Sequence, residues 1–123
     1  MANREHPMTI IYVAYGADNP LWAEKGHGYI AKRYLYFREE GCPHDKPHRF
    51  ELHEVIVLDG WRDDIIQAVE EYKRRYREWM KAKEQFIRDL DSRLADLRLM
   101  MIQGWEEQNP MPRFTLQKFT ERA

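Results

Sequence analysis

The segment from Trp61 to Gln108 constrains the fold of this chain more than any other part of its sequence. It contains no proline, and its first glycine is Gly104. When it is drawn as a helix, one series of large apolar residues falls within a stripe about 100° wide. The sequence therefore predicts a long amphipathic helical segment over residues 63–108. The stripe consists of Ile65, Val69, Tyr72, Tyr76, Trp79, Phe86, Leu90, Leu94, Leu97, Met101 and Trp105.

The length of this segment raises the question of what covers its apolar stripe. A continuous helix of about 45 residues would span roughly 68 Å, whereas a domain of this size has a radius of gyration of about 14 Å. Either the helix folds back near Ser92, which could cap a second helix, or a second copy of the chain covers the excess. We expect a homodimer. The residues expected at its interface are Tyr72, Tyr76, Trp79, Phe86, Leu90, Leu94, Leu97 and Met101.

The first half of the chain has the pattern of a β-sheet. Three runs rich in β-branched and aromatic residues, 8–15, 28–39 and 48–59, are separated by clusters of turn-forming residues. We interpret them as a three-stranded antiparallel meander spanning residues 8–59. After the prolines that end the helical segment, residues 110–123 could add a fourth strand or form a tail.

These elements define the expected fold class. It is α+β, a small antiparallel sheet of three or four strands followed by one long amphipathic helix or a helical hairpin. The length of 123 residues suits a single domain, 1–123, with its own hydrophobic core.

The charge and cysteine content bound the function. A net charge of −1 gives no general attraction to nucleic acid or to an anionic membrane. The single cysteine excludes an internal disulfide and suits a reducing compartment. No apolar run approaches the roughly 20 residues needed to cross a bilayer. We therefore expect a cytoplasmic protein.

One stretch, GCPHDKPHRFELHEV, concentrates residues that could bind a metal. Cys42, His44 and His48 have a spacing that could place sulfur and nitrogen ligands around one zinc ion. However, there is no second cysteine, and two prolines restrict the backbone that would have to wrap the ion. We interpret the stretch as a turn, and we expect no metal site and no cofactor.

No catalytic motif stands out. A Cys42 nucleophile with a neighbouring histidine as base is conceivable, but adjacent turn residues rarely supply the nucleophile, the base and the oxyanion donors together. A small enzyme or nucleotide-binding pocket near the 15–28 loop, lined by Tyr15, Trp22 and His27, is a second alternative. His27 is flanked by glycines, which allow a ligand to approach the backbone closely. We expect a protein that is not an enzyme.

Two surfaces are candidates for binding. In the second run, Lys32, Tyr34, Tyr36 and Arg38 share one face of a strand, while Tyr29, Leu35 and Phe37 share the better core face. Tyrosine and arginine are favoured in protein interfaces, although such a face can also be ordinary sheet surface.

The second candidate surface is a ridge of basic residues opposite the apolar stripe. Arg74, Arg77, Lys81 and Arg88 could follow a phosphate backbone. The alternative is a solvated helix face on which Glu70–Arg74 and Glu84–Arg88 pair at i, i+4.

Taken together, these features favour a small non-catalytic binding protein that occupies a macromolecular surface. We expect a regulator, adaptor or inhibitor whose partners are itself and another protein, with no membrane. Small proteins of phages and mobile elements are often built this way, which is an analogy of size alone. The alternative is a nucleic-acid-binding accessory protein that uses the basic helix ridge.

Overall fold

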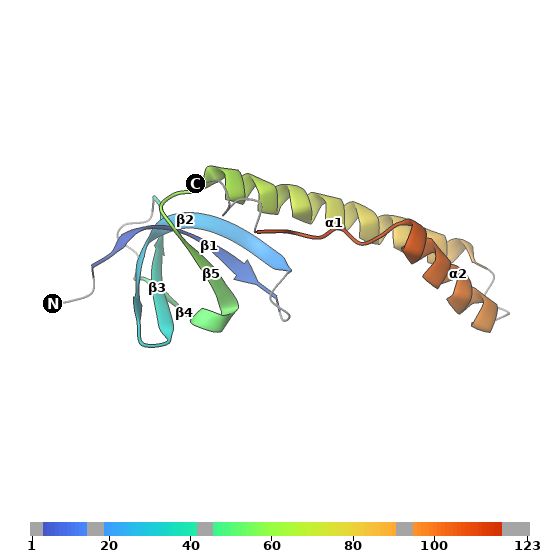
Figure 1. The fold of residues 1–123 in the computed structure, drawn as a ribbon, viewed down its shortest axis with the longest axis horizontal. Helices are drawn as coiled ribbons and strands as arrows, with labels where there is room; N and C mark the ends of the chain where they lie inside the picture. Colours follow the sequence, from blue (N-terminus) through green and yellow to red (C-terminus); the bar gives the residue numbers. More distant parts are fainter. Residues whose placement is uncertain (1–3, 15–18, 42–45, 91–94, 117–123) are drawn as a thin grey trace. The chain divides into compact units, whose positions relative to one another are not determined.

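The computed structural model describes residues 4–14, 19–41, 46–90 and 95–116 (Figure 1). It confirms the α+β class. The strands are β1 (His6–Val13), β2 (Pro20–Ala31), β3 (Tyr34–Glu39), β4 (His48–Glu51) and β5 (Val55–Asp59). A 3₁₀ turn, η1 (Leu52–Glu54), and two helices, α1 (Asp63–Asp89) and α2 (Ala95–Gln108), complete the fold. The chain forms two compact units. The first contains the residues up to Glu71 together with those from Phe114 onward, and the second contains Tyr72–Arg113.

The number of strands corrects the sequence prediction, because the sheet has five strands and not three or four. The run 28–39 is a hairpin in which β2 and β3 are joined by the two residues Lys32 and Arg33. Lys32 has φ 59°, in the left-handed region that residues other than glycine, asparagine and aspartate seldom adopt. Because the turn consists of a lysine and an arginine, no typical turn residue marks this hairpin in the sequence.

The strand order is also not the predicted meander. The run 48–59 is interrupted by η1, and β5 then pairs with β1, so the order is β4-β3-β2-β1-β5 with antiparallel neighbours. β4 and β5 form the two edges of the sheet, yet only three residues separate them. A link of this length reaches at most about 14 Å. The sheet must therefore curve until its edges approach each other, as Figure 1 shows.

The inner face of the curved sheet carries the main core. Met8, Ile10, Leu35, Phe37 and Val55 are buried there, with Tyr12, Phe50, Leu52 and Val57 packed against them. Burial of each large apolar side chain contributes about 1.5–3 kcal/mol to folding. The predicted core positions of Leu35 and Phe37 are confirmed.

A second core lies on the opposite, outer face, over β1 and β5. Ile65 and Val69 from the first turns of α1 pack there against Ile11 and Val13. Phe114 and Leu116, from the segment after α2, pack against the same core. Over the described residues 110–116 this segment forms no strand.

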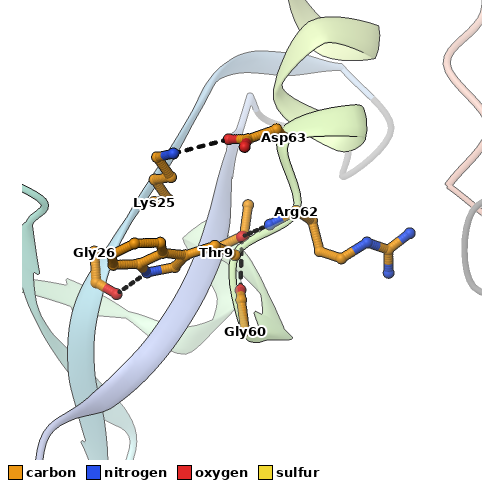
Figure 2. Close-up of polar contacts among 7 residues, drawn as sticks. Thr9, Lys25, Gly26, Gly60, Arg62 and Asp63 are labelled. Atoms are coloured by element: carbon orange, nitrogen blue, oxygen red, sulfur yellow. Dashed lines mark hydrogen bonds and ion pairs between the residues drawn. The ribbon is translucent and has the colours of Figure 1, made fainter.

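A buried threonine fixes the start of α1 (Figure 2). The hydroxyl of Thr9 donates to the carbonyl oxygen of Gly60 at 2.8 Å and accepts the backbone N–H of Arg62 at 2.8 Å. The ammonium of Lys25 lies 3.0 Å from the carboxylate of Asp63 in the first helical turn, where negative charge is favourable. These bonds tie β1 and β2 to the helix that follows β5.

The helical segment forms a hairpin in the second unit. α1 ends at Asp89 and α2 begins at Ala95, and the predicted breakpoint Ser92 lies outside the described residues. The ring of Trp105 packs 6.0 Å from that of Trp79 and 5.7 Å from that of Phe86. The indole N–H of Trp79 also donates to the carbonyl oxygen of Asn109 at 2.7 Å.

The hairpin changes the reasoning behind the predicted homodimer. Because α2 covers part of the α1 stripe within one chain, the length of the stripe no longer requires a second copy, and dimerisation stays a prediction. Among the described residues, no helix has the length and apolarity needed to cross a membrane.

Candidate functional site

The outer face of β2, β3 and β4 gathers aromatic and cationic side chains. The strand register places His27 opposite Arg38, Tyr29 opposite Tyr36, and Tyr36 opposite Arg49. Side chains alternate between the faces of a strand. With Leu35 and Phe37 in the inner core, these residues therefore share the outer face. We call this surface the tyrosine face and define it as His27, Tyr29, Tyr34, Tyr36, Arg38 and Arg49.

Contacts within the tyrosine face hold its side chains in place. The rings of Tyr29 and Tyr36 are stacked, with centroids 5.1 Å apart and planes inclined by 17°. The guanidinium of Arg49 lies 4.6 Å from the ring centroid of Tyr34. All of these aromatic side chains remain partly exposed. Side chains that are already ordered lose less entropy when a partner binds.

The structure brings together most of the residues predicted for this surface. Tyr34, Tyr36 and Arg38 share the outer face as expected, and Arg38 also donates to the carboxylate of Glu5 at 3.1 Å. Lys32, by contrast, lies in the exposed hairpin turn and not within a strand.

Sequence reasoning missed three members of the face and placed Tyr29 in the core. The error follows from reading 28–39 as one strand, in which residues 29 and 36 must point to opposite sides. The two-residue turn reverses the chain and makes Tyr29 and Tyr36 direct partners. His27 and Arg49 were missed for a similar reason, because their place depends on the register between strands.

The glycines that flank His27 serve the sheet. A Cβ atom at Gly26 would lie 2.1 Å from the carbonyl oxygen of Arg38, and one at Gly28 would lie 2.4 Å from that of Tyr36. Both distances are far below van der Waals contact, so only glycine lets β2 and β3 approach this closely. These glycines allow the approach of a neighbouring strand, where the sequence had suggested the approach of a ligand.

A pocket of about 400 Å³ adjoins one end of the tyrosine face. Its lining residues are Glu5, His27, Arg38, Glu39, Glu40, Gly41 and Trp61. The indole N–H of Trp61 donates to the carbonyl oxygen of Gly26 at 3.0 Å, and its ring meets that of His27 edge-on at 5.5 Å. Trp61 belongs to the linker between β5 and α1, which gave no functional signal in the sequence.

The structure separates the residues of the predicted 15–28 pocket. Tyr15 lies outside the described residues. Trp22 and His27 are five positions apart on β2, on opposite faces of the sheet. Trp22 stacks on Tyr12 with ring centroids 4.3 Å apart. Tyr12 donates to the carboxylate of Glu54 at 3.1 Å, and this hydrogen bond raises the pKa of Tyr12.

The basic helix ridge is exposed and partly neutralised. Arg74, Arg77, Lys81 and Arg88 all lie on the surface of α1. Arg74 pairs with Glu78 at 2.6 Å, and the predicted pair of Arg88 with Glu84 is present at 3.6 Å. Within the described parts of the chain, Arg77 and Lys81 have no acidic partner.

Of the three residues considered as metal ligands, the structure describes only His48. Cys42 and His44 lie outside the described residues, and His48 is exposed at the start of β4. Around η1, the side chains of Glu51, His53 and Glu54 bring their possible ligand atoms within 4.8 Å of one another. Exposed carboxylates often gather in this way without an ion, so this cluster supports no metal site.

The predicted dimerisation residues divide between the hairpin interior and its surface. The rings of Tyr72 and Tyr76, and those of Tyr76 and Trp79, lie 6.0 Å apart along α1. Phe86 and Leu90 are half-buried, and Leu94 lies outside the described residues. On α2, large apolar side chains are exposed: Leu97 at 51%, Leu99 at 57%, Met100 at 66% and Met101 at 45%. Leu97, Met100 and Met101 lie within about 100° on one side of the helix, and we call these three residues the α2 apolar face.

The tyrosine face consists mainly of aromatic and guanidinium groups, which bury large areas and form directional contacts at binding surfaces. Comparison with known proteins finds no matching family model, curated protein or solved structure.

Proposed function

We propose that this chain is a small non-catalytic binding protein, a regulator, adaptor or inhibitor, that occupies the surface of a partner protein with its tyrosine face. The observation that carries the proposal is the stacked Tyr29–Tyr36 pair beside the Arg49–Tyr34 contact on the outer face of the sheet. Tyrosine and arginine are among the residue types most often found as the energetically dominant residues of protein interfaces.

Charge favours a protein partner over a nucleic acid. Of the two arginines on the tyrosine face, Arg38 is paired with Glu5, and Glu51 lies opposite Tyr34 in the register. A surface that follows a phosphate backbone needs several cations that are not already neutralised. On the α1 ridge, only Arg77 and Lys81 meet that condition among the described residues. Nucleic-acid binding by this ridge remains the alternative function.

The α2 apolar face supports the second part of the proposal, self-association. A two-fold symmetric dimer needs one patch that is complementary to itself. An apolar patch meets this condition, because it presents no charge that its own copy would repel. The expected interface is thus Leu97, Met100 and Met101, whereas the stripe residues Trp79 and Phe86 contact Trp105 within the hairpin.

The proposed function can be tested before the partner is identified. Peptides are selected from a random library against the immobilised protein, and their affinities are measured for wild type and for a Tyr29→Ser/Tyr36→Ser double variant. Loss of about 2 kcal/mol, typical of a dominant interface residue, weakens binding about 30-fold. Circular dichroism confirms that the variant is folded.

The matched control is the Arg77→Glu/Lys81→Glu variant, which removes the two unpaired cations of the helix ridge. It should leave peptide affinity within about twofold of wild type. Retained peptide binding by the tyrosine variant would contradict the proposal. Tight, salt-sensitive binding of an oligonucleotide that the ridge variant abolishes would favour the alternative function.

A further inference from the structure

The pocket beside the tyrosine face has an aromatic wall that is fixed and accessible. Trp61 is 43% exposed, while its indole N–H is bound to the carbonyl oxygen of Gly26. The ammonium of Lys25 already lies 5.2 Å from the centroid of this ring. Aromatic faces attract cations, and tryptophan does so most strongly. Figure 2 shows Lys25 and Gly26 on β2, next to the start of α1.

The charge of the pocket has the sign that suits a cation. Its lining includes the acidic residues Glu5, Glu39 and Glu40 against one arginine, Arg38, which gives a formal charge of −2 with His27 neutral. The negative charge of Glu39 also raises the pKa of Glu24 on the neighbouring strand, in addition to the larger effect of burial. A phosphate or carboxylate would be repelled here, and a basic group attracted.

The pocket is also continuous with the proposed binding surface. His27 lies two residues before Tyr29 on β2, and Arg38 lies two residues after Tyr36 on β3. Two residues along a strand span about 6.6–6.8 Å. A peptide that crosses the Tyr29–Tyr36 pair can therefore place a neighbouring side chain in the pocket.

We propose that this pocket binds a basic side chain, arginine or lysine, of the protein segment that contacts the tyrosine face. The aromatic wall of Trp61 receives the cation by a cation–π contact, and Glu39 and Glu40 supply compensating charge, since Glu5 is paired with Arg38. This inference rests on the proposed function and specifies the chemistry of the partner. It also separates the two functional classes, because a negatively charged pocket disfavours nucleic acid.

The test uses the whole chain and a small probe, N-acetyl-arginine N-methylamide. The probe is titrated into ¹⁵N-labelled protein, and the Trp61 indole N–H signal and the backbone signals of His27 and Glu40 are followed by NMR. Saturable shifts confined to these signals are expected. N-acetyl-citrulline N-methylamide has nearly the same shape without the charge and should bind at least about fivefold more weakly, as loss of about 1 kcal/mol of cation–π attraction implies.

Two variants and one competing ion complete the test. Trp61→Leu should weaken binding of the arginine probe about fivefold or more. Trp22→Leu, which alters an exposed tryptophan on the opposite face of the sheet, should not. Equal affinities for the arginine and citrulline probes, no saturable shift at Trp61, or preferential binding of inorganic phosphate would each overturn the proposal.

The outcomes distinguish this inference from the proposed function. If the Tyr29→Ser/Tyr36→Ser variant loses its selected peptides while the arginine probe leaves Trp61 unaffected, the pocket assignment is wrong and the proposed function stands. If the probe binds at Trp61 but the tyrosine variant keeps its peptides, the pocket binds cations and the tyrosine face is not the partner surface.

Discussion

At the scale of single residues, the hydroxyl of Thr9 is the contact most open to direct test. Thr9 is fully buried, and its hydroxyl bonds both Gly60 and Arg62 at the junction between β5 and α1. Thr9→Val keeps the shape but leaves a backbone carbonyl and a backbone N–H unpaired. We expect the free energy of unfolding, measured by urea denaturation, to fall by about 2 kcal/mol.

The control for this prediction is Thr9→Ser, which retains the hydroxyl and loses only a methyl group. It should cost about 1 kcal/mol or less. A Thr9→Val variant as stable as wild type would show that water or a backbone shift replaces the two hydrogen bonds.

The carboxyl group of Glu24 should make stability depend on pH. Burial, and then the charge of Glu39, raise its pKa in the folded protein above the ordinary value of 4.5, although a hydrogen bond from Trp22 and the charge of His48 oppose this shift. The folded state therefore binds the proton more tightly than the unfolded state, and stability falls as the pH rises above about 4.5.

The corresponding experiment compares Glu24→Gln with wild type by urea denaturation from pH 4 to pH 7. The neutral amide avoids the penalty of a buried charge, so the variant should gain stability relative to wild type as the pH rises. A stability difference that does not change with pH would contradict the assigned cause.

At the scale of elements, the close approach of β2 and β3 depends on Gly28. A methyl group at this position would lie 2.4 Å from the carbonyl oxygen of Tyr36 and 3.1 Å from the sulfur of Met8. Gly28→Ala must therefore push the two strands apart. We expect a loss of about 2 kcal/mol or more in thermal or urea unfolding, together with a disturbed Tyr29–Tyr36 pair.

Gly104 provides the matched control for Gly28. It lies inside α2, and a Cβ atom there would meet nothing within 4 Å. Gly104→Ala should therefore stabilise the protein by about 0.5–1 kcal/mol, because alanine favours the helix and restricts the unfolded chain. If both substitutions had the same effect, the strand spacing would not be the reason for glycine at position 28.

The elements also show what the sequence could and could not predict. The predicted apolar stripe includes Ile65 and Val69, which are buried, because helix periodicity is a local property. Alternation likewise identified Leu35 and Phe37. The hairpin turn at Lys32 and the break at η1 were missed, since neither contains the glycine or proline that usually marks a turn.

The candidate site depended on these missed turns. Tyr34, Tyr36 and Arg38 could be grouped from spacing along one strand. Tyr29 and Arg49 join them only through pairing between strands, which a single sequence does not reveal. Trp61 reaches the pocket because Thr9 and Gly26 fix the linker that carries it, and this is a tertiary effect.

At the scale of the whole molecule, self-association through the α2 apolar face makes a simple prediction. Sedimentation equilibrium should give about twice the chain mass of 15.0 kDa. Met100→Glu places a charge on the most exposed of these side chains and should yield a monomer with unchanged helical content. A wild-type protein that remains a monodisperse monomer at high micromolar concentration would contradict the dimer.

The central claim is that the tyrosine face is the surface that meets the partner. The most direct measurement is NMR mapping of a library-selected peptide on the wild-type protein, with backbone shifts followed to saturation. We expect the largest shifts at Tyr29, Tyr34, Tyr36 and Arg49, extending to Trp61 and leaving the α1 ridge unchanged. Shifts centred on Arg77 and Lys81, or on the α2 apolar face, with the tyrosine face unaffected, would contradict the claim.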